Sequence, residues 1–163
     1  MIKHYVFIAG IVALLVLARF LSGAPQESAA ASPHAAAKVR VSAAEVVLPR
    51  DPTGHFHVDA EVNGRDIRML ADTGASYVTL GEDAAESLGL DPDSLDYSES
   101  AQTANGTVAV AVVELDEVRV GSIVRRDVRA VVTRGFPGAL LGMSFFSTLS
   151  KVSIESNELV LKD

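Results

Sequence analysis

The chain has no cysteine and few basic residues, and both absences narrow its chemistry. Without cysteine among its 163 residues, disulfide bonds, thiolate nucleophiles and cysteine-ligated metals are excluded. Any nucleophile must therefore use oxygen or nitrogen. The 14 Lys and Arg side chains are outnumbered by 21 Asp and Glu, which gives a net charge of −7. Nucleic-acid backbones are bound by clustered cations, so we predict no nucleic-acid partner.

The sequence also offers little for a metal site or a serine nucleophile. His55 and His57 are two residues apart on a predicted strand and so face the same side, but no third ligand converges on them. We predict no metal and no cofactor. Neither Ser76 nor Ser144 lies in a glycine-flanked nucleophile elbow. Ser144, which precedes two phenylalanines, is interpreted as a helix N-cap.

An apolar run opens the chain. Residues 5–18 are uncharged, and the segment reaches about the length that spans a bilayer when it is extended to Leu21. We predict that residues 1–21 are an uncleaved signal anchor, with a cleaved signal peptide as the alternative because 22–24 is a fair cleavage site. The Ala-, Ser- and Pro-rich stretch 22–45 is predicted to be a flexible linker. The domain that follows would be exported.

Residues 46–163 are predicted to form one mainly β domain. Apolar and polar side chains alternate from Phe56 to Val62, and Asn63-Gly64 supplies the turn of a tight hairpin that returns from Arg65 to Leu70. A second hairpin tip is expected around Asn105-Gly106. Further strands are expected at 77–80, 108–112, 118–120, 127–132, 151–154 and 159–161, with a short helix at 81–89.

The most informative motif is Asp72-Thr73-Gly74-Ala75, which directly follows an apolar strand. A carboxylate on a glycine-containing turn behind a buried strand is held rigidly and half-desolvated, the condition in which Asp acts as an acid or base. A lone Asp is also found as a helix N-cap, a turn residue or an ion-pair partner. The functional interpretation is favoured because the motif is echoed downstream by Leu140-Leu141-Gly142, ahead of a predicted helix.

With these motifs, the chain resembles the retropepsin-like aspartic proteases, and more closely their bacterial membrane-anchored single-domain members. The resemblance implies a single-lobe acid-protease fold, a closed β-barrel with a flap hairpin and one or two short helices. It also implies site residues. Asp72 would be the catalytic carboxylate, Thr73 would brace two active-site loops, and Gly74 would let the backbone approach the substrate. Ala75 fits the retroviral-type pattern, and Leu140, Leu141 and Gly142 would pack beneath the loop. The flap would comprise Gln102, Thr103, Ala104, Asn105, Gly106 and Thr107.

The single motif makes a homodimer the expected form of the enzyme. Peptide hydrolysis by this route needs two carboxylates that share one proton. About 120 residues are too few for two lobes, so the second Asp72 would come from a second copy across a two-fold axis. Retroviral enzymes usually carry Arg after the downstream glycine and an acidic residue beyond the catalytic loop. Here those places hold Met143 and Ser76, so the dimer contacts are expected to differ.

The sequence therefore predicts a membrane-anchored aspartic endopeptidase that cuts peptides on the periplasmic side of the inner (plasma) membrane. Its partners would be a protein or peptide substrate, a second copy and the membrane. The main alternative is a non-catalytic periplasmic peptide-binding or assembly domain with the same fold. A purely structural exported β-domain is disfavoured because it explains neither the glycine-bearing loop nor its downstream echo.

Overall fold

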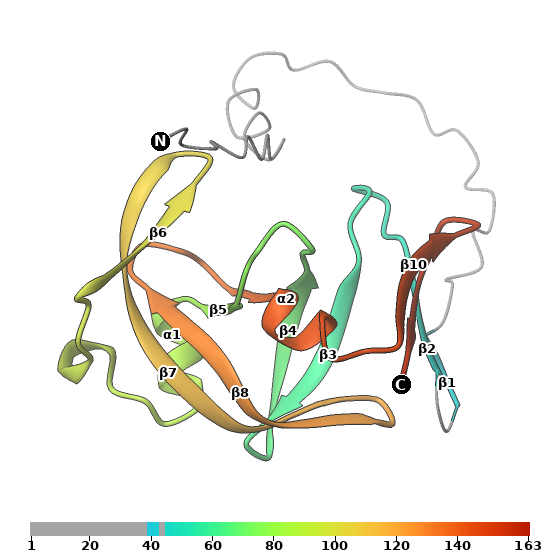
Figure 1. The fold of residues 1–163 in the computed structure, drawn as a ribbon, viewed down its shortest axis with the longest axis horizontal. Coiled ribbons are helices and arrows are strands. Elements are labelled where there is room, and N and C mark those ends of the chain that lie inside the picture. The colour runs from blue at the N-terminus through green and yellow to red at the C-terminus, as the bar shows by residue number, and fades with distance from the viewer. Residues whose placement is uncertain (1–38, 43–44) are drawn as a thin grey trace, which may run out of the picture.

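The computed structural model describes residues 39–42 and 45–163, and their strands form two β-sheets (Figure 1). The predicted signal anchor, 1–21, lies outside the described residues. Within the described part, no helix is long and apolar enough to cross a membrane.

The larger sheet closes into a barrel. Its strands run in the order β3-β4-β9-β5-β8-β7-β6, and β3 also pairs with β7. This closure confirms the predicted mainly β, barrel-like architecture. The strands are β3 (His57–Val62), β4 (Arg65–Ala71), β5 (Val78–Leu80), β6 (Glu99–Thr103), β7 (Gly106–Val120), β8 (Ile123–Thr133) and β9 (Ala139–Leu141).

The smaller sheet is antiparallel and joins the two ends of the described chain. Its order is β1 (Arg40–Val41), β2 (Glu45–Pro49), β11 (Glu158–Lys162) and β10 (Lys151–Glu155). The predicted linker, 22–45, is therefore wrong at its C-terminal end, because it includes β1. Arg40 donates two hydrogen bonds, of 2.8 and 2.7 Å, to the Glu158 carboxylate. Partners so distant in sequence leave no local signal.

The described residues contain two short α-helices and one 3-10 turn. Helix α1 (Glu82–Ser87) starts after Gly81, and two acidic residues in its first turn suit the positive end of the helix dipole. Gly89, just past its end, has φ +85, a conformation that glycine adopts without strain. The helix predicted at 81–89 is thus confirmed, with frayed ends. The others are η1 (Pro92–Ser94) and α2 (Met143–Phe146).

One predicted connection between strands is confirmed and another is absent. Asn63 and Gly64 both have positive φ, as a two-residue hairpin between β3 and β4 requires. The separate strands predicted at 108–112 and 118–120 are wrong, because they belong to the continuous 15-residue strand β7. In the charged stretch between them, Glu114 and Glu117 lie opposite arginines of β8.

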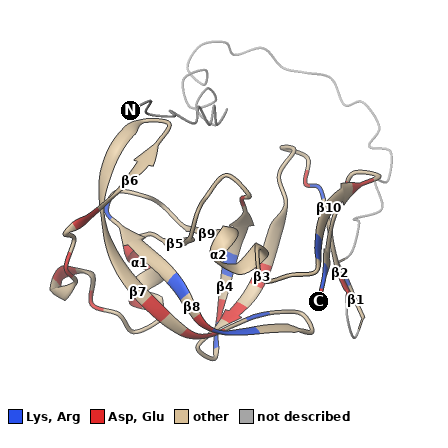
Figure 2. Ribbon diagram, viewed as in Figure 1, with Lys and Arg blue, Asp and Glu red and all other residues tan. Residues whose placement is uncertain are grey.

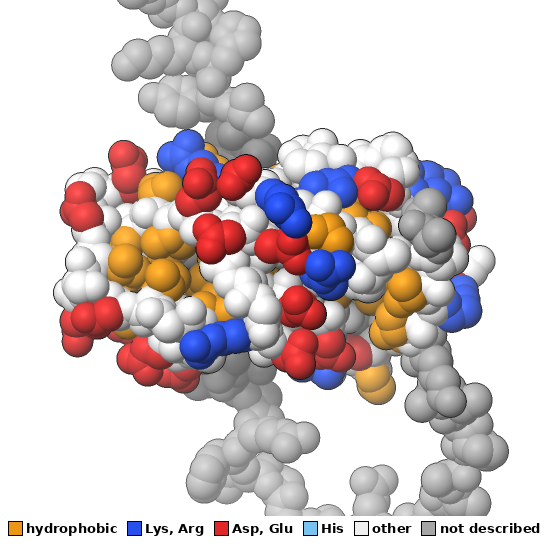
Figure 3. Space-filling view, turned by 90° about the horizontal axis from the view of Figure 1, so that it is seen from below, with side chains coloured by type: hydrophobic (Ala, Val, Ile, Leu, Met, Phe, Trp, Pro, Cys, Tyr) orange, Lys and Arg blue, Asp and Glu red, His pale blue; other side chains and the backbone are white. Residues whose placement is uncertain are grey.

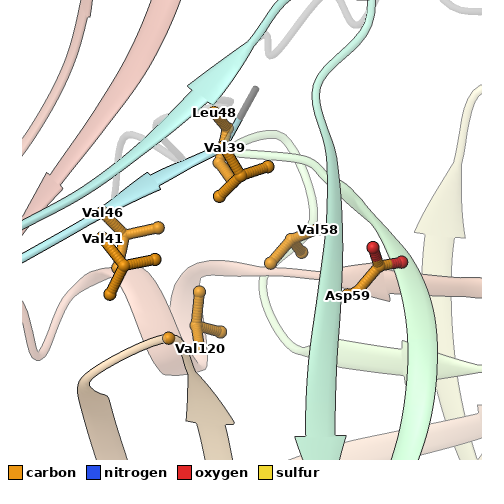
Figure 4. Close-up of a pocket in the computed structure, with 8 residues that line it drawn as sticks. Val39, Val41, Val46, Leu48, Val58, Asp59 and Val120 are labelled. Atoms are coloured by element: carbon orange, nitrogen blue, oxygen red, sulfur yellow. The ribbon is translucent and has the colours of Figure 1, made fainter. Parts of the chain in front are cut away.

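The core lies inside the barrel and continues toward the smaller sheet. Val46 and Leu48 of β2 point toward Val58 of β3 and Val120 of β7, and these side chains line a small apolar pocket (Figure 4). Phe145 of α2 is fully buried in the same hydrophobic cluster. The two sheets therefore share one core.

Charged side chains form a mixed network on the lower face of the barrel. Glu117 of β7 contacts Arg119 at 2.6 Å and Arg126 at 3.3 Å, and Arg119 also contacts Glu61 of β3 at 3.8 Å. From below, acidic and basic side chains intermingle across the middle of this face (Figure 3). Each exposed pair contributes little to stability, and no patch of a single sign forms there.

We predict that Phe145→Ala destabilises the fold by about 3–5 kcal/mol, because it leaves a cavity in the core. The Phe145 side chain is fully buried, and its ring packs edge-on against that of Phe146 at a centroid distance of 6.1 Å. Urea unfolding followed by circular dichroism measures the loss. Val112→Ala is the control. Val112 is 41% exposed, so its truncation should cost less than about 1 kcal/mol. Equal losses would contradict this description of the core.

Candidate active site

Asp72 lies at the point where strand β4 leaves the barrel. Its backbone N–H donates a 2.9 Å hydrogen bond to the carbonyl oxygen of Leu141, which extends the parallel pairing of β4 with β9 by one residue. The Asp72 side chain is partly buried. The carboxylate is therefore presented from the end of a rigid sheet.

The turn after Asp72 folds back onto the carboxylate. The N–H of Gly74 donates to Asp72 Oδ1 at 2.8 Å, and the N–H of Ala75 donates to the Asp72 carbonyl oxygen at 3.2 Å. A Cβ atom on Gly74 would lie 3.1 Å from Asp72 Oδ1, so glycine leaves room for this contact. Among the described residues Asp72 has no ion-pair partner. Thr73, Gly74 and Ser76 are exposed beside it.

Strand β9 passes between the two strands that the loop connects. Leu140 is opposite Leu70 of β4 on one side and opposite Thr79 of β5 on the other. Loop 72–77 must therefore arch over the chain where β9 ends, at Gly142. A Cβ atom on Gly142 would lie 2.1 Å from the Tyr77 carbonyl oxygen. The predicted motif 140–142 is thus brought directly under the loop.

Helix α2 then holds the loop from below through three hydrogen bonds. The N–H of Met143 donates to Ala75 O at 2.8 Å, and that of Ser144 donates to Ser76 O at 3.0 Å. The N–H of Val78 donates to Ser144 Oγ at 2.8 Å. The prediction that Ser144 caps the helix is wrong, because Gly142 occupies the N-cap position. The Ser144 hydroxyl accepts instead from Val78, the first residue of β5, directly after the loop.

The predicted flap residues lie at the end of the β6–β7 hairpin. This end is on the same upper side of the molecule as loop 72–77 (Figure 1). Thr103 Oγ1 donates to Gly106 O at 2.8 Å, and Thr107 Oγ1 donates to Gln102 Oε1 at 2.9 Å. Ala104 and Asn105 form the tip. The hairpin from Ser100 to Val113 contains no charged residue and is uncoloured in Figure 2.

Comparison with known protein families identifies the family of this chain. The profile of the aspartyl protease family matches residues 58–145, more than half of the chain, including Asp72 and Gly142. The chain belongs to the aspartyl proteases. Its fold matches the crystal structure of a retropepsin-like aspartic protease from Rickettsia conorii, with a TM-score of 0.66 and 32% identity. That match covers 75% of this chain and 100% of the other. The predicted retropepsin-like fold is confirmed.

Two curated bacterial relatives of this chain are described only as uncharacterized. A protein from the cobV 5′ region of a Sinorhizobium species is 46% identical over 121 residues, which are 73% of this chain and 52% of that protein. A protein of Rickettsia prowazekii (strain Madrid E) is 32% identical over 117 residues, 72% of this chain and 51% of that protein. The chain spans about half the length of these curated relatives.

The sequence did not predict a second loop, residues 51–55, which leads into β3 beside β4. Asp51 accepts hydrogen bonds from Thr53 Oγ1 at 2.6 Å, from the Thr53 N–H at 2.8 Å and from the His55 N–H at 2.9 Å. The Phe56 carbonyl oxygen accepts from Ala71 N–H at 2.9 Å, next to Asp72. The residues Asp-Pro-Thr-Gly at 51–54 are typical of a turn and could have indicated this loop.

Of the two histidines considered as metal ligands, His55 belongs to this loop and His57 begins β3. His55 precedes β3 and does not share a strand with His57, so the predicted common face is wrong. His57 Nδ1 instead lies 3.0 Å from Asp51 Oδ2. Among the described residues, no group of three or more His, Asp or Glu side chains is placed to hold a metal ion.

We predict that the loop around Asp51 stays intact until strongly acidic pH. The hydrogen bond from the Thr53 side chain, followed by that from the His55 N–H, holds the pKa of Asp51 well below its ordinary 3.8. A lowered folded pKa gives stability that is present above the unfolded pKa and is lost as pH falls through the folded one. Asp51→Ala should therefore lower the Tm at neutral pH, and the difference from wild type should shrink only below about pH 4. Thermal unfolding from pH 2 to 7 measures it. A difference that is constant over this range would contradict the assignment.

We predict that Gly142→Ala destabilises the fold by about 3 kcal/mol, the upper end of the usual overpacking cost. The new methyl group would meet two backbone carbonyl oxygens, those of Tyr77 and Ala75, at 2.1 and 2.8 Å. Neither carbonyl can move without shifting the loop that carries Asp72. Denaturant unfolding measures the loss. Ser147→Ala, at the exposed end of α2, is the control and should unfold within about 1 kcal/mol of wild type.

Proposed function

We propose that this protein is an aspartic endopeptidase in which two Asp72 carboxylates of a homodimer activate water for peptide-bond hydrolysis. The observation that carries the proposal is the geometry of the loop. It holds a single partly buried Asp72 at the end of β4, anchored by Leu141 and Gly74. A carboxylate so placed is oriented for chemistry and free of ion pairing within the described residues.

The chemistry requires a second carboxylate. Aspartic proteases are themselves the reference case, in which two Asp carboxylates about 3 Å apart share one proton because both cannot ionise. The ionised carboxylate accepts a proton from the attacking water, while the protonated one donates to the carbonyl oxygen of the scissile bond. These two roles need opposite protonation states. Asp72 alone cannot hold both at once.

A second copy of the chain is the source that the sequence allows. The Asp-Thr-Gly motif occurs once, at 72–74, and the described residues form one barrel. Two copies related by a two-fold axis would present the same loop to each other. The exposed Thr73 and Ser76 beside Asp72 would then become contacts between loops. The dyad would lie on the axis.

The β6–β7 hairpin is the proposed cover for the substrate. It extends from the barrel on the same upper side as loop 72–77 (Figure 1), and β6 is an edge strand of its sheet. Its uncharged surface suits an extended peptide bound through backbone hydrogen bonds and apolar contacts. We therefore propose unstructured protein segments as the substrate class.

We also propose a location for the enzyme. The apolar segment 1–21 would anchor the chain in the inner membrane, with the protease domain on the periplasmic side. Two copies held in one membrane have a raised effective concentration. Anchoring would thus favour the pairing that catalysis needs.

We predict that Asp72→Asn lowers the rate of cleavage of an unstructured protein by about 100-fold or more, because the amide cannot exchange a proton with water. The full chain is assayed in detergent micelles at mildly acidic and neutral pH, with pepstatin as a probe. Asp59→Asn is the matched control. The Asp59 side chain is 76% exposed on β3, so its loss should leave the rate unchanged.

Two results would contradict the proposal. Equal cleavage by wild type and Asp72→Asn would remove the catalytic assignment and leave a peptide-binding domain as the better description. Cleavage by a protein that stays monomeric at every concentration would remove the shared dyad. The specific activity of wild type should instead rise with protein concentration.

A further inference from the structure

One face of the barrel sheet carries Asp72 together with a row of side chains from four strands. Residues that lie opposite each other on neighbouring strands point to the same side of a sheet. Paired in this way, Leu70 of β4, Leu140 of β9, Thr79 of β5 and Val131 of β8 form one line across the sheet. Asp72 is two residues beyond Leu70, so strand alternation directs its side chain to the same face.

Tyr77 and Arg129 lie on this face as well. Tyr77 is two residues before Thr79, and Arg129 is two residues before Val131. Because β5 and β8 run antiparallel to β9 and β4, both steps lead toward the end of the sheet at which Asp72 lies. Three strand spacings separate β4 from β8, so the Cα atoms of Asp72 and Arg129 are about 14 Å apart.

The Arg129 side chain is held in place by an aromatic ring. Its guanidinium carbon lies over the Tyr77 ring, 5.1 Å from the ring centroid, in the geometry of a cation–π contact. The side chain is otherwise exposed. Tyr77 therefore orients the guanidinium on the face of Asp72 and leaves its N–H donors available.

Arg129 is the one cation in the part of the chain that the structure describes that has no polar partner. Every other Lys and Arg side chain there forms an ion pair or donates a hydrogen bond. Glu114 of β7 lies opposite Arg129 in the sheet, but the two side chains form no ion pair. A planar guanidinium with free donors matches a carboxylate in geometry and in charge.

We propose that Arg129, positioned by Tyr77, binds the carboxylate of an Asp or Glu side chain in the substrate and so determines specificity. An extended peptide advances about 3.4 Å per residue. The distance from Asp72 to the Tyr77–Arg129 pair, about two to three strand spacings, then corresponds to the third or fourth residue from the scissile bond. This proposal rests on the proposed function, and in a homodimer each protomer would supply an Arg129, one on either side of the bond.

The preference is tested by digesting a mixture of random synthetic peptides with the full chain in detergent micelles, at about pH 6, where Glu is ionised. Mass spectrometry then locates the cut bonds. With wild type, Asp and Glu should be enriched at the third or fourth residue on either side of the cut. Arg129→Gln should lose this enrichment, and Arg129→Glu should replace it with enrichment of Lys and Arg.

Arg126→Gln is the matched control. It removes the same charge from the same strand, but Arg126 is 75% exposed and pairs with Glu117 on the lower face of the barrel. Its enrichment should equal that of wild type. An equal loss in Arg126→Gln and Arg129→Gln would show an effect of net charge alone and would overturn the assignment.

The size of the effect is measured on a pair of cleaved peptides that differ only in Glu or Gln at the enriched position. Wild type should show a kcat/KM about tenfold higher for the Glu peptide, as a charge-assisted hydrogen bond gives. Arg129→Gln should bring this ratio close to one. The ratio of wild type should also fall as salt is added, because the pair is exposed to solvent.

A binding measurement separates this inference from the proposed function. The Asp72→Asn protein is titrated into fluorescein-labelled peptides with a central Leu-Leu, in which the third and fourth residues on each side are all Glu or all Gln. Fluorescence anisotropy should give about tenfold tighter binding of the Glu peptide. Adding Arg129→Gln should abolish the difference.

The two proposals fail in different ways. Cleavage that depends on Asp72, with the same Glu-to-Gln ratio in wild type and Arg129→Gln, would overturn only the role of Arg129. A binding difference that disappears with Arg129→Gln, in a protein whose wild type cleaves no peptide, would contradict the proposed function alone.

Discussion

The passage of one strand under a loop is the constraint on which the rest of the structure depends. Strand β9 lies between β4 and β5, and the loop that connects those two strands must arch over its end. The chain at Gly142 therefore comes so close to the loop carbonyls that no side chain fits. Because the loop is supported on its lower side by Leu141, Met143 and Ser144, its upper side is left to present Asp72.

This support explains why an Asp in a turn can act as more than a surface charge. The N–H groups of Gly74 and Ala75 define the geometry around Asp72 from within the turn, and the sheet defines its position. Preorganised groups lose little on reaching the transition state. The hydrogen bonds that hold the loop all lie within one chain.

The other surfaces differ in whether their charged and apolar groups have partners within the described residues. On the lower face of the barrel, Glu117 and Glu61 both form ion pairs with Arg119. Acidic and basic positions lie close together on the ribbon there (Figure 2). The β6–β7 hairpin is uncharged, and the β10 edge carries an uncovered Ile154. A closed barrel has few free edges. Among the described residues, the edge strands β6 and β10 therefore leave backbone groups without a neighbouring strand.

Local signals predicted the elements that local chemistry determines. The hairpin at Asn63-Gly64, the helix after Gly81 and the Asp72 motif could all be found because turn geometry and side-chain alternation depend on neighbours in the chain. The roles of Asp72 and of the flap stay predictions of the resemblance. The transmembrane segment also stays a prediction, since it lies outside the described residues.

Other features depend on partners far away in sequence, and only the tertiary structure decided them. Strand β1 pairs with β2, and its Arg40 also meets Glu158, which is 118 residues away. The stretch around Glu117 is a strand because it pairs with β8, where arginines lie opposite. The Ser144 hydroxyl accepts from Val78 at the start of β5, 66 residues away, while Gly142 takes the N-cap position of the helix. The sequence by itself determined that this chain carries one Asp-Thr-Gly turn behind a strand. The position of β9 beneath that turn depends on its pairing with β4 and β5. Such pairing between distant strands produces no pattern in the sequence of either strand.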